Sequence, residues 1–237
     1  QADIRGSGSV SRSLGDGDGY LPGEGVGAVL LKPLSAALRD GDRIHGLIKS
    51  SFVNHGGGRQ VYTAPDPKQI ATLMRQSIQR SGLDPETIGY IESAVNGSEL
   101  GDPIEVRALK NVFADCKQQR PLGSVKSNLG HLEAASGMSQ LSKVLLQMQH
   151  RTLVPSINAR PLNPHINFDD SPFFVQEDTM DWVAMRDAQT GAELPRRSMI
   201  NSLGVGGAYA NLIIEEFIAP ELSDSVSNGD SAIEDQQ

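Results

Sequence analysis

Residues 123–137 constrain the fold of this chain more than any other stretch. An apolar run at 122–125 predicts a strand that stops at a Gly- and Ser-rich turn, and a helical pattern follows from about 132 to 150. The turn carries Lys126 and His131, a fixed cation and a titratable imidazole beside backbone N–H groups. Because such groups favour developing negative charge, the segment predicts a site. Its local composition fits equally well the start of an ordinary helix that carries a histidine.

Two other glycine-rich elements, at 94–101 and 204–207, adjoin predicted strands. At 100–105, Asp102 is expected as the N-cap of a helix, with Pro103 at its first position and Glu105 completing a capping box. At 204–210, a glycine-rich tip joins two strands and lets backbone N–H groups approach a ligand closely. A glycine loop of this kind is, by itself, more often a plain turn.

The rest of the chain reads as alternating strands and helices. Glycines at 23–27 lead into the apolar run 28–31, which predicts a buried strand. Prolines predict an irregular segment at 153–173, and Trp182 with its charged neighbours predicts a surface excursion. A helical face containing Met138 and Met148 predicts core filler. The other expected elements are a surface loop at 1–19, a helical turn at 33–40, strands at 42–52, 88–92, 197–202 and 212–217, and a helix at 66–80.

Composition excludes several function classes. The 237 residues carry a net charge of −8 and lack a long apolar run, so neither a nucleic acid nor a membrane is expected as a partner. The single cysteine, Cys116, excludes an internal disulfide, fits a reducing cytoplasm and is expected to be structural. His45, His55, His150 and His165 lack companions at metal spacing, so no metal site is expected, although His55 can line an entrance. Gln1 in place of an initiator methionine suggests part of a longer or processed chain.

Four motifs in order resemble the ketosynthase (β-ketoacyl synthase) family. They are DGYLPGEGVG at 18–27, LGDPIE at 100–105, KSNLGHLE at 126–133 and the glycine loop at 204–211. The chain is most similar to the modular polyketide synthase branch, and residues 54–57 and 62–65 resemble the version found in trans-acyltransferase systems.

The resemblance implies a fold and a division of the chain. The fold is α/β and thiolase-like, with α-β-α-β-α layers, of which this chain supplies the C-terminal half plus the end of the N-terminal half. Residues 1–19 are then a loop at the start, 20–218 the C-terminal portion of a ketosynthase domain, and 219–237 an acidic disordered tail or linker.

The resemblance also implies a mechanism. A cysteine accepts an acyl chain carried on the phosphopantetheine of an acyl carrier protein, and two histidines promote decarboxylation and condensation of a malonyl extender. His131 matches the second histidine and Lys126 the lysine of the site, while Glu133 is expected to orient that lysine or the helix start. The backbone N–H of Val205 is expected as an oxyanion donor. The supporting residues implied by the motifs are Asp102, Asn128, Gly204 and Gly206.

This sequence departs from the family pattern at three points. Ala94 stands where the first histidine belongs, and the nucleophilic cysteine is expected upstream of Gln1. In the terminal glycine loop, Val205 replaces an aromatic residue, and Ala208 and Tyr209 replace a Thr-Asn pair.

Three hypotheses follow. The first is a non-elongating ketosynthase that accepts and passes on an acyl chain without condensation. The second is an inert scaffold that completes a split ketosynthase and organises the assembly line. The third is a condensing enzyme in which Ser93 or Asn96 replaces the missing donor. The expected partners are the N-terminal half of the ketosynthase, an acyl carrier protein and a second copy of the full domain. No directly bound cofactor is expected.

Overall fold

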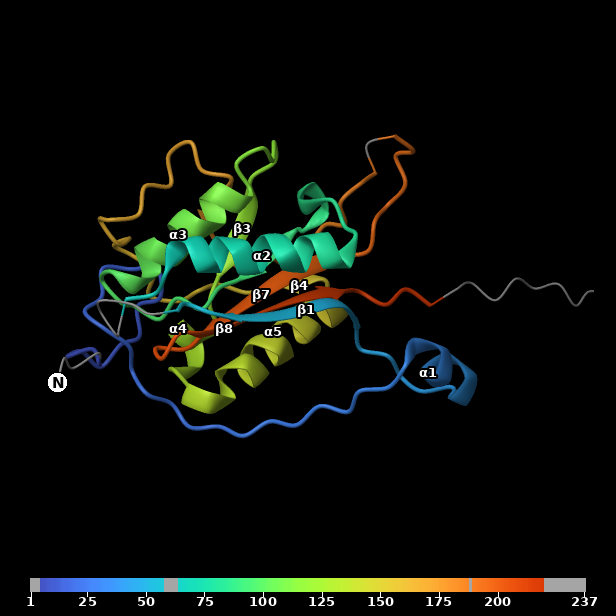
Figure 1. Ribbon diagram of the computed structural model, residues 1–237, viewed down its shortest axis with the longest axis horizontal. Coiled ribbons are helices and arrows are strands. Elements are labelled where there is room, and N and C mark those ends of the chain that lie inside the picture. The colour runs from blue at the N-terminus through green and yellow to red at the C-terminus, as the bar shows by residue number, and fades with distance from the viewer. Residues whose placement is uncertain (1–4, 58–63, 188, 220–237) are drawn as a thin grey trace, which may run out of the picture.

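The chain folds into a layered α/β structure. The computed structural model describes residues 5–57, 64–187 and 189–219. Helices α2 and α3 cover one face of a six-stranded sheet and α5 covers the other (Figure 1). The helices are α1 (Leu34–Asp40), α2 (Pro67–Ser81), α3 (Gly101–Val112), α4 (Lys126–Leu129) and α5 (Ser136–His150), with short 3₁₀ turns η1 (Pro85–Thr87) and η2 (Glu133–Ala135). The strands are β1 (Leu47–His55), β2 (Tyr90–Glu92), β3 (Arg120–Gly123), β4 (Thr152–Leu153), β5 (Phe173–Val175), β6 (Met180–Asp181), β7 (Arg197–Leu203) and β8 (Ala208–Glu215).

Sheet topology determines where the sequence motifs meet. The strand order is β1-β8-β7-β2-β3-β5, with β2 parallel to both β3 and β7. β8 runs antiparallel to β7 and to β1, and a separate pair joins β4 with β6. Because parallel strands end at the same edge of a sheet, the segments that follow β2, β3 and β7 emerge side by side.

Helix α2 has the boundaries that its sequence predicts. Asp66 caps it by accepting hydrogen bonds from the backbone N–H groups of Lys68 and Gln69, and Gly82 ends it in the left-handed conformation with φ of 67°. Ile70, Leu73 and Met74 on one face are buried against the sheet. The expected helical turn at 33–40 is likewise confirmed as α1.

Trp182 belongs to the core, so the expected surface excursion is wrong at this residue. Its side chain is only 3% exposed, and its ring packs edge-on against Tyr90 with centroids 5.7 Å apart. Its backbone N–H donates to the carbonyl oxygen of Arg151 at 2.7 Å. The large apolar area of the indole outweighs its charged neighbours in sequence. Together with Val144, Met148 and Ile214 it fills the core between α5 and the sheet.

The apolar run at 28–31 is exposed, which contradicts the expected buried strand. Leu30 is 95% exposed, and within the described residues this run joins no sheet. The alternate glycines Gly23, Gly25 and Gly27 face Leu129, Leu132 and Met138, so one side of this segment lies on the end of α4, the turn after it and the start of α5. The segment crosses below α5 toward α1 (Figure 1). Among the described residues, no second layer covers its other side, as a buried strand would need.

Several expected boundaries are wrong for local reasons. The helix expected from 132 begins at Ser136, because Gly130 at φ 78° and Glu133 at φ 49° interrupt the helical path. The strand expected at 42–52 begins only at Leu47. The second hairpin strand, expected at 212–217, begins at Ala208.

The first described segment is more buried than the surface loop that was expected. Residues 5–19 form no helix or named strand, yet Leu14 is 0% exposed and packs in the main core. The motif residues Tyr62 and Thr63 and the tail at 220–237 lie outside the described residues. Across the described ranges, every helix is too short or too polar to cross a lipid bilayer.

Candidate active site

The three glycine-rich motifs meet at one edge of the sheet. The loop after β2 and the turn after β3 are joined where Ser93 donates its backbone N–H and its hydroxyl to the carbonyl oxygen of Gly123, both at 2.9 Å. The amide nitrogen Nε2 of Gln140 donates to the carbonyl oxygens of Ser93 and Asn201, at 2.9 and 2.8 Å. A single buried side chain on α5 therefore connects the loop after β2 to β7.

Two buried carboxylates hold the loop that contains Ala94. Asp102 accepts backbone N–H bonds from Asn96, Gly97 and Leu14, at 3.0, 3.0 and 3.1 Å. Asp102 is therefore not the N-cap of α3, which begins at Gly101 without a side-chain cap, and the capping-box prediction is wrong. Its carboxylate instead compensates the backbone N–H groups of a buried loop, which would otherwise lack partners.

Glu105 is the second of these carboxylates. Its Oε1 accepts the N–H of Ala94 at 3.0 Å and the side-chain amide of Asn201 at 2.9 Å. Burial, only partly offset by these hydrogen bonds and by the Lys126 charge, raises the pKa of Glu105 to about 7. The helix start predicted at LGDPIE is thus confirmed, but both of its acidic residues point to the loop after β2.

Lys126 is brought directly to Ala94. The side chain is 2% exposed, and its Nζ donates to the carbonyl oxygen of Ala94 at 2.5 Å. Burial lowers the pKa of Lys126, and the nearby carboxylates of Glu105, Asp102 and Glu92 oppose that shift. The backbone of Ala94 is therefore held by Glu105 at its N–H and by Lys126 at its carbonyl, while its methyl side chain offers no donor.

His131 is positioned by the turn between α4 and η2. Its Nδ1 accepts the backbone N–H of Glu133 at 2.9 Å and lies 3.2 Å from the hydroxyl of Ser136. Burial, and next the positive charge of Lys126, lower the pKa of His131 to about 4. Since Nδ1 accepts a hydrogen bond, this pattern assigns the proton of the neutral ring to Nε2.

Glu133 was expected to orient Lys126 or the helix start, and its side-chain hydrogen bond is made with Tyr20. Its Oε1 accepts the phenol hydroxyl of Tyr20 at 2.6 Å, and its carboxylate acts on Lys126 only through charge. The other expectation, a role at the helix start, is supported by its position at the first residue of η2. Tyr20 is a site residue that the sequence reasoning missed, although the DGY motif contains it.

The third glycine motif forms the tip of the β7–β8 hairpin. Gly204 donates its N–H to Ala208 and accepts from Gly207, at 2.8 and 2.9 Å, so the tip is a tight turn. Val205 and Gly206 are the exposed central residues, with Val205 40% exposed. The parallel pairing of β7 with β2 places this tip at the same sheet edge as the other two motifs.

Of the two alternative donors named from the sequence, Ser93 is already engaged as a donor. Ser93 is 0% exposed and donates its hydroxyl proton to Gly123. Asn96 uses its side-chain oxygen to accept the N–H of Ser98 at 3.1 Å. Ser93 therefore has no hydroxyl proton left for a substrate. The hydrogen bond of Asn96 uses only its oxygen, so its side-chain N–H groups stay open as alternative donors.

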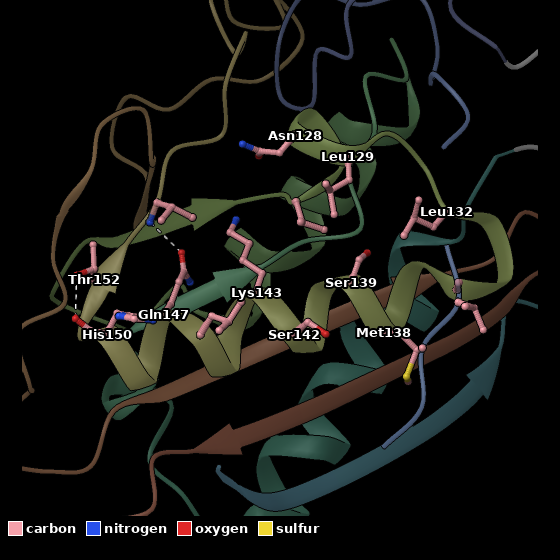
Figure 2. Close-up of a pocket in the computed structure, with 16 residues that line it drawn as sticks. Asn128, Leu129, Leu132, Met138, Ser139, Ser142, Lys143, Gln147, His150 and Thr152 are labelled. Atoms are coloured by element: carbon pink, nitrogen blue, oxygen red, sulfur yellow. Dashed lines mark hydrogen bonds between the residues drawn. The ribbon is translucent and has the colours of Figure 1, made fainter. Parts of the chain in front are cut away.

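An apolar groove of about 700 Å³ runs along α5. Asn128 and Leu132 lie above α5, and Met138, Lys143 and His150 follow one another along the helix (Figure 2). Met138 is therefore a groove residue rather than core filler, whereas Met148 is buried as expected. The extended segment contributes Val26, which is 100% exposed. This face of the C-terminal half thus presents apolar side chains to the solvent.

The remaining candidates lie away from these contacts. Burial raises the pKa of the Cys116 thiol despite the positive charge of Arg120 nearby, so Cys116 is a poor nucleophile. His55 Nδ1 accepts the N–H of Gly57 at 2.9 Å, and its place at an entrance stays a prediction. Across residues 5–57, 64–187 and 189–219, no group of three or more metal-ligating side chains is present.

Similar proteins agree on the family. Residues 45–160 match the family described as beta-ketoacyl synthase, C-terminal domain. Polyketide synthase PksR of Bacillus subtilis is 65% identical over 93% of this chain, and polyketide synthase ThaQ of Burkholderia thailandensis is 47% identical over 90% of it. The chain spans only 9% and 10% of the lengths of these two relatives.

Solved structures agree on the fold. The oxazolomycin ketosynthase domain OzmH KS7 of Streptomyces albus is 44% identical with a TM-score of 0.88, over 92% of this chain and 39% of that one. The ketosynthase from module 6 of the bacillaene synthase of Bacillus subtilis is 40% identical with a TM-score of 0.81, over 87% of this chain and 37% of that one. The fold is therefore the thiolase-like α/β fold, of which this chain supplies the C-terminal half.

Proposed function

Because this chain belongs to the C-terminal ketosynthase domains of modular polyketide synthases, we propose that it is part of a non-elongating ketosynthase. Such a domain accepts an acyl chain from an acyl carrier protein and passes it on without forming a carbon–carbon bond. The trans-acyltransferase type of system belongs to the same proposal. It rests on the motif resemblance and on the geometry around Ala94.

The observation that carries the proposal is the alanine held between Glu105 and Lys126. Condensation passes through an enolate, whose oxygen needs hydrogen-bond donors as charge develops on it. Ala94 is 7% exposed and its backbone is engaged on both sides, so this position supplies no donor. Losing one such donor costs about 10²- to 10³-fold in rate.

Acyl transfer, unlike condensation, does not need a hydrogen-bond donor at position 94. A cysteine thiolate from the N-terminal half attacks the thioester carbonyl, the oxyanion forms, and the carrier thiolate leaves and takes up a proton. The backbone N–H of Val205 would serve as one oxyanion donor, and a main-chain donor does not depend on its side chain. The side chain at position 94 takes no part in this step, so its loss affects condensation more than transfer.

His131 is the retained donor in this proposal. With Nδ1 occupied by Glu133 N–H, the Nε2–H can donate to the carbonyl oxygen of a thioester held beside Lys126. The low pKa of about 4 keeps the ring neutral at physiological pH, so it acts as a hydrogen-bond donor and not as an acid. Lys126 contributes to this neutrality through its charge.

The N-terminal half of the ketosynthase is the first partner we propose. Its place would be the groove on α5 and the exposed run at 28–31, because both present apolar surface that a soluble fold covers. An acyl carrier protein, a second copy of the full domain and a cytoplasmic setting belong to the same proposal. No cofactor is needed, since the acyl group arrives on phosphopantetheine.

An inert scaffold is the second candidate, favoured by Tyr209 in the glycine loop. Its side chain is 1% exposed, and its hydroxyl accepts the backbone N–H of Asp66 at 2.9 Å. The Tyr209 hydroxyl thus ties the hairpin to the start of α2, which is a structural role for this loop.

Loading separates the two candidates. The ketosynthase domain that contains this chain is incubated with an acyl carrier protein bearing a labelled acyl group, and intact-protein mass spectrometry follows the domain. We expect a mass increase of one acyl group and its loss to a second, unloaded carrier protein. A folded domain that never gains the acyl group would contradict transfer and leave the scaffold. Bovine albumin or an apo carrier protein serves as the negative control.

A further inference from the structure

Tyr20 and the residues after it clamp the turn that carries His131. The backbone N–H of His131 donates to the carbonyl oxygen of Leu21 at 2.8 Å, and Gly23 N–H donates back to the His131 carbonyl oxygen at 2.9 Å. The Tyr20 ring lies against the imidazole with centroids 4.8 Å apart and planes tilted by 48°. The two segments are more than 100 residues apart in sequence, so this contact is a tertiary feature of the site.

Glu133 holds a backbone conformation that its side chain does not favour. Its φ is 49°, in the left-handed region that residues with a Cβ rarely adopt. This conformation aims the Glu133 N–H at Nδ1 of His131, 2.9 Å away. A strained residue of this kind persists only where its surroundings fix it. The hydrogen bond from Tyr20 Oη to Glu133 Oε1, at 2.6 Å, is such a restraint.

We propose that Tyr20 is a positioning residue that fixes the tautomer of His131 through Glu133. The chain of contacts runs from the Tyr20 hydroxyl to the Glu133 carboxylate, through the Glu133 backbone, and from its N–H to Nδ1. The result is a ring that carries its proton on Nε2. This inference rests on the proposed function, in which the Nε2–H of His131 is the donor to the bound thioester.

The charges around the imidazole fit this role. Lys126 and Glu133 are the charged groups that act on His131, and they act in opposite directions. The Tyr20 hydroxyl engages Glu133, and the Glu133 carboxylate is thereby kept at Tyr20 and not on the imidazole. A carboxylate released onto the ring would favour its protonated form and convert a neutral donor into a cation.

The test reads the tautomer directly. The full ketosynthase domain is prepared with isotopically labelled histidine, and the nitrogen chemical shifts of His131 are assigned with a His131→Gln variant. We expect the wild type to show a protonated Nε2 and an unprotonated Nδ1. Tyr20→Phe keeps the ring and removes the hydroxyl. In this variant the ratio of the Nε2-protonated to the Nδ1-protonated tautomer should fall about fivefold, which is the contribution of one ordinary hydrogen bond. Identical His131 nitrogen shifts in Tyr20→Phe and in the wild type would overturn the proposal.

A second background tests whether Tyr20 acts through Glu133. Glu133→Gly keeps the backbone N–H, removes the carboxylate and accepts a positive φ without strain. In that background Tyr20→Phe should change the tautomer ratio no further. An equal effect in both backgrounds would overturn the proposal, because Tyr20 would then act through its ring or through the general fold.

Two more variants keep the test decisive. If Tyr20→Phe fails to fold, Glu133→Ala removes the acceptor instead of the donor and must produce the same fall in the ratio. Tyr209→Phe removes a buried hydroxyl that contacts Asp66 and should leave the His131 shifts unchanged. The tautomer is read without any reaction, so a domain that condenses would contradict the proposed function while leaving this result standing.

Discussion

Lys126 donates its side-chain hydrogen bond to the backbone of Ala94, the residue that in our proposal takes the place of a catalytic histidine. Glu105 binds the same residue from the other side through its N–H. The support for position 94 is thus present while the side chain that would use it is absent. A change confined to one side chain in a fixed backbone is the kind of change that removes one reaction and spares another.

Removing the Lys126 charge should raise the pKa of His131. Burial and the Lys126 charge lower that pKa to about 4, so Lys126→Met leaves burial opposed by the Glu133 charge. We expect the pKa to move up toward the ordinary value of about 6.5 without reaching it. A histidine titration by NMR measures the change. Lys143→Met, which removes another buried lysine, is the control, and an equal rise there would show a general loss of structure.

Glu105 should make stability fall as the pH rises. Its pKa is raised to about 7 in the folded protein, so between about 4.5 and 7 the folded state binds more protons than the unfolded state. The stabilisation is therefore present at pH values below this window and is lost as the pH rises through it, by about 3 kcal/mol at most.

Glu105→Gln isolates this contribution, because the amide oxygen can still accept from Ala94 and Asn201. Urea unfolding at both ends of the window should show a smaller loss of stability with rising pH in the variant. His131, whose pKa is lowered, has the opposite slope, and it is present in both proteins. Parallel pH profiles for wild type and variant would show that Glu105 does not titrate in this range.

Trp182 should contribute strongly to stability. Truncation of a buried aromatic side chain costs about 3–5 kcal/mol, so Trp182→Ala should lower the free energy of unfolding by that amount. Trp182→Phe keeps a ring against Tyr90 and should cost less. Denaturant titration measures both. A loss below about 0.5 kcal/mol in Trp182→Ala, the range of ordinary surface substitutions, would place the residue outside the core.

The sequence predicted which segments come together more reliably than it described the contacts between them. Lys126 and His131 were predicted from a glycine-rich turn between a strand and a helix, and such turns have local signals. The roles of Asp102 and Glu105 were misassigned. An acidic residue at these positions can cap the helix or accept N–H groups from a distant loop, and the sequence does not distinguish the two roles. Tyr20 was missed since its partner Glu133 is 113 residues away. No local pattern carries a contact at that separation.

The same distinction explains the errors in the fold. Helix α2 was predicted well, because its N-cap, apolar face and terminal glycine are all local. Trp182 is buried by α5 and Tyr90, which its charged sequence neighbours do not indicate. The run at 28–31 has the composition of a buried strand, but within the described residues no second sheet covers it.

Condensation by the full domain, with and without a restored histidine, tests the central proposal most directly. Ala94→His places an imidazole on a backbone that Glu105 and Lys126 already hold, and Ala94→Phe adds a ring without a donor as the matched control. With an acyl-loaded domain and a malonyl carrier protein, product is measured by mass spectrometry. We predict acylation without extension in wild type and Ala94→Phe, and condensation about 10²- to 10³-fold faster in Ala94→His. Wild-type condensation as fast as that of Ala94→His would contradict the proposal.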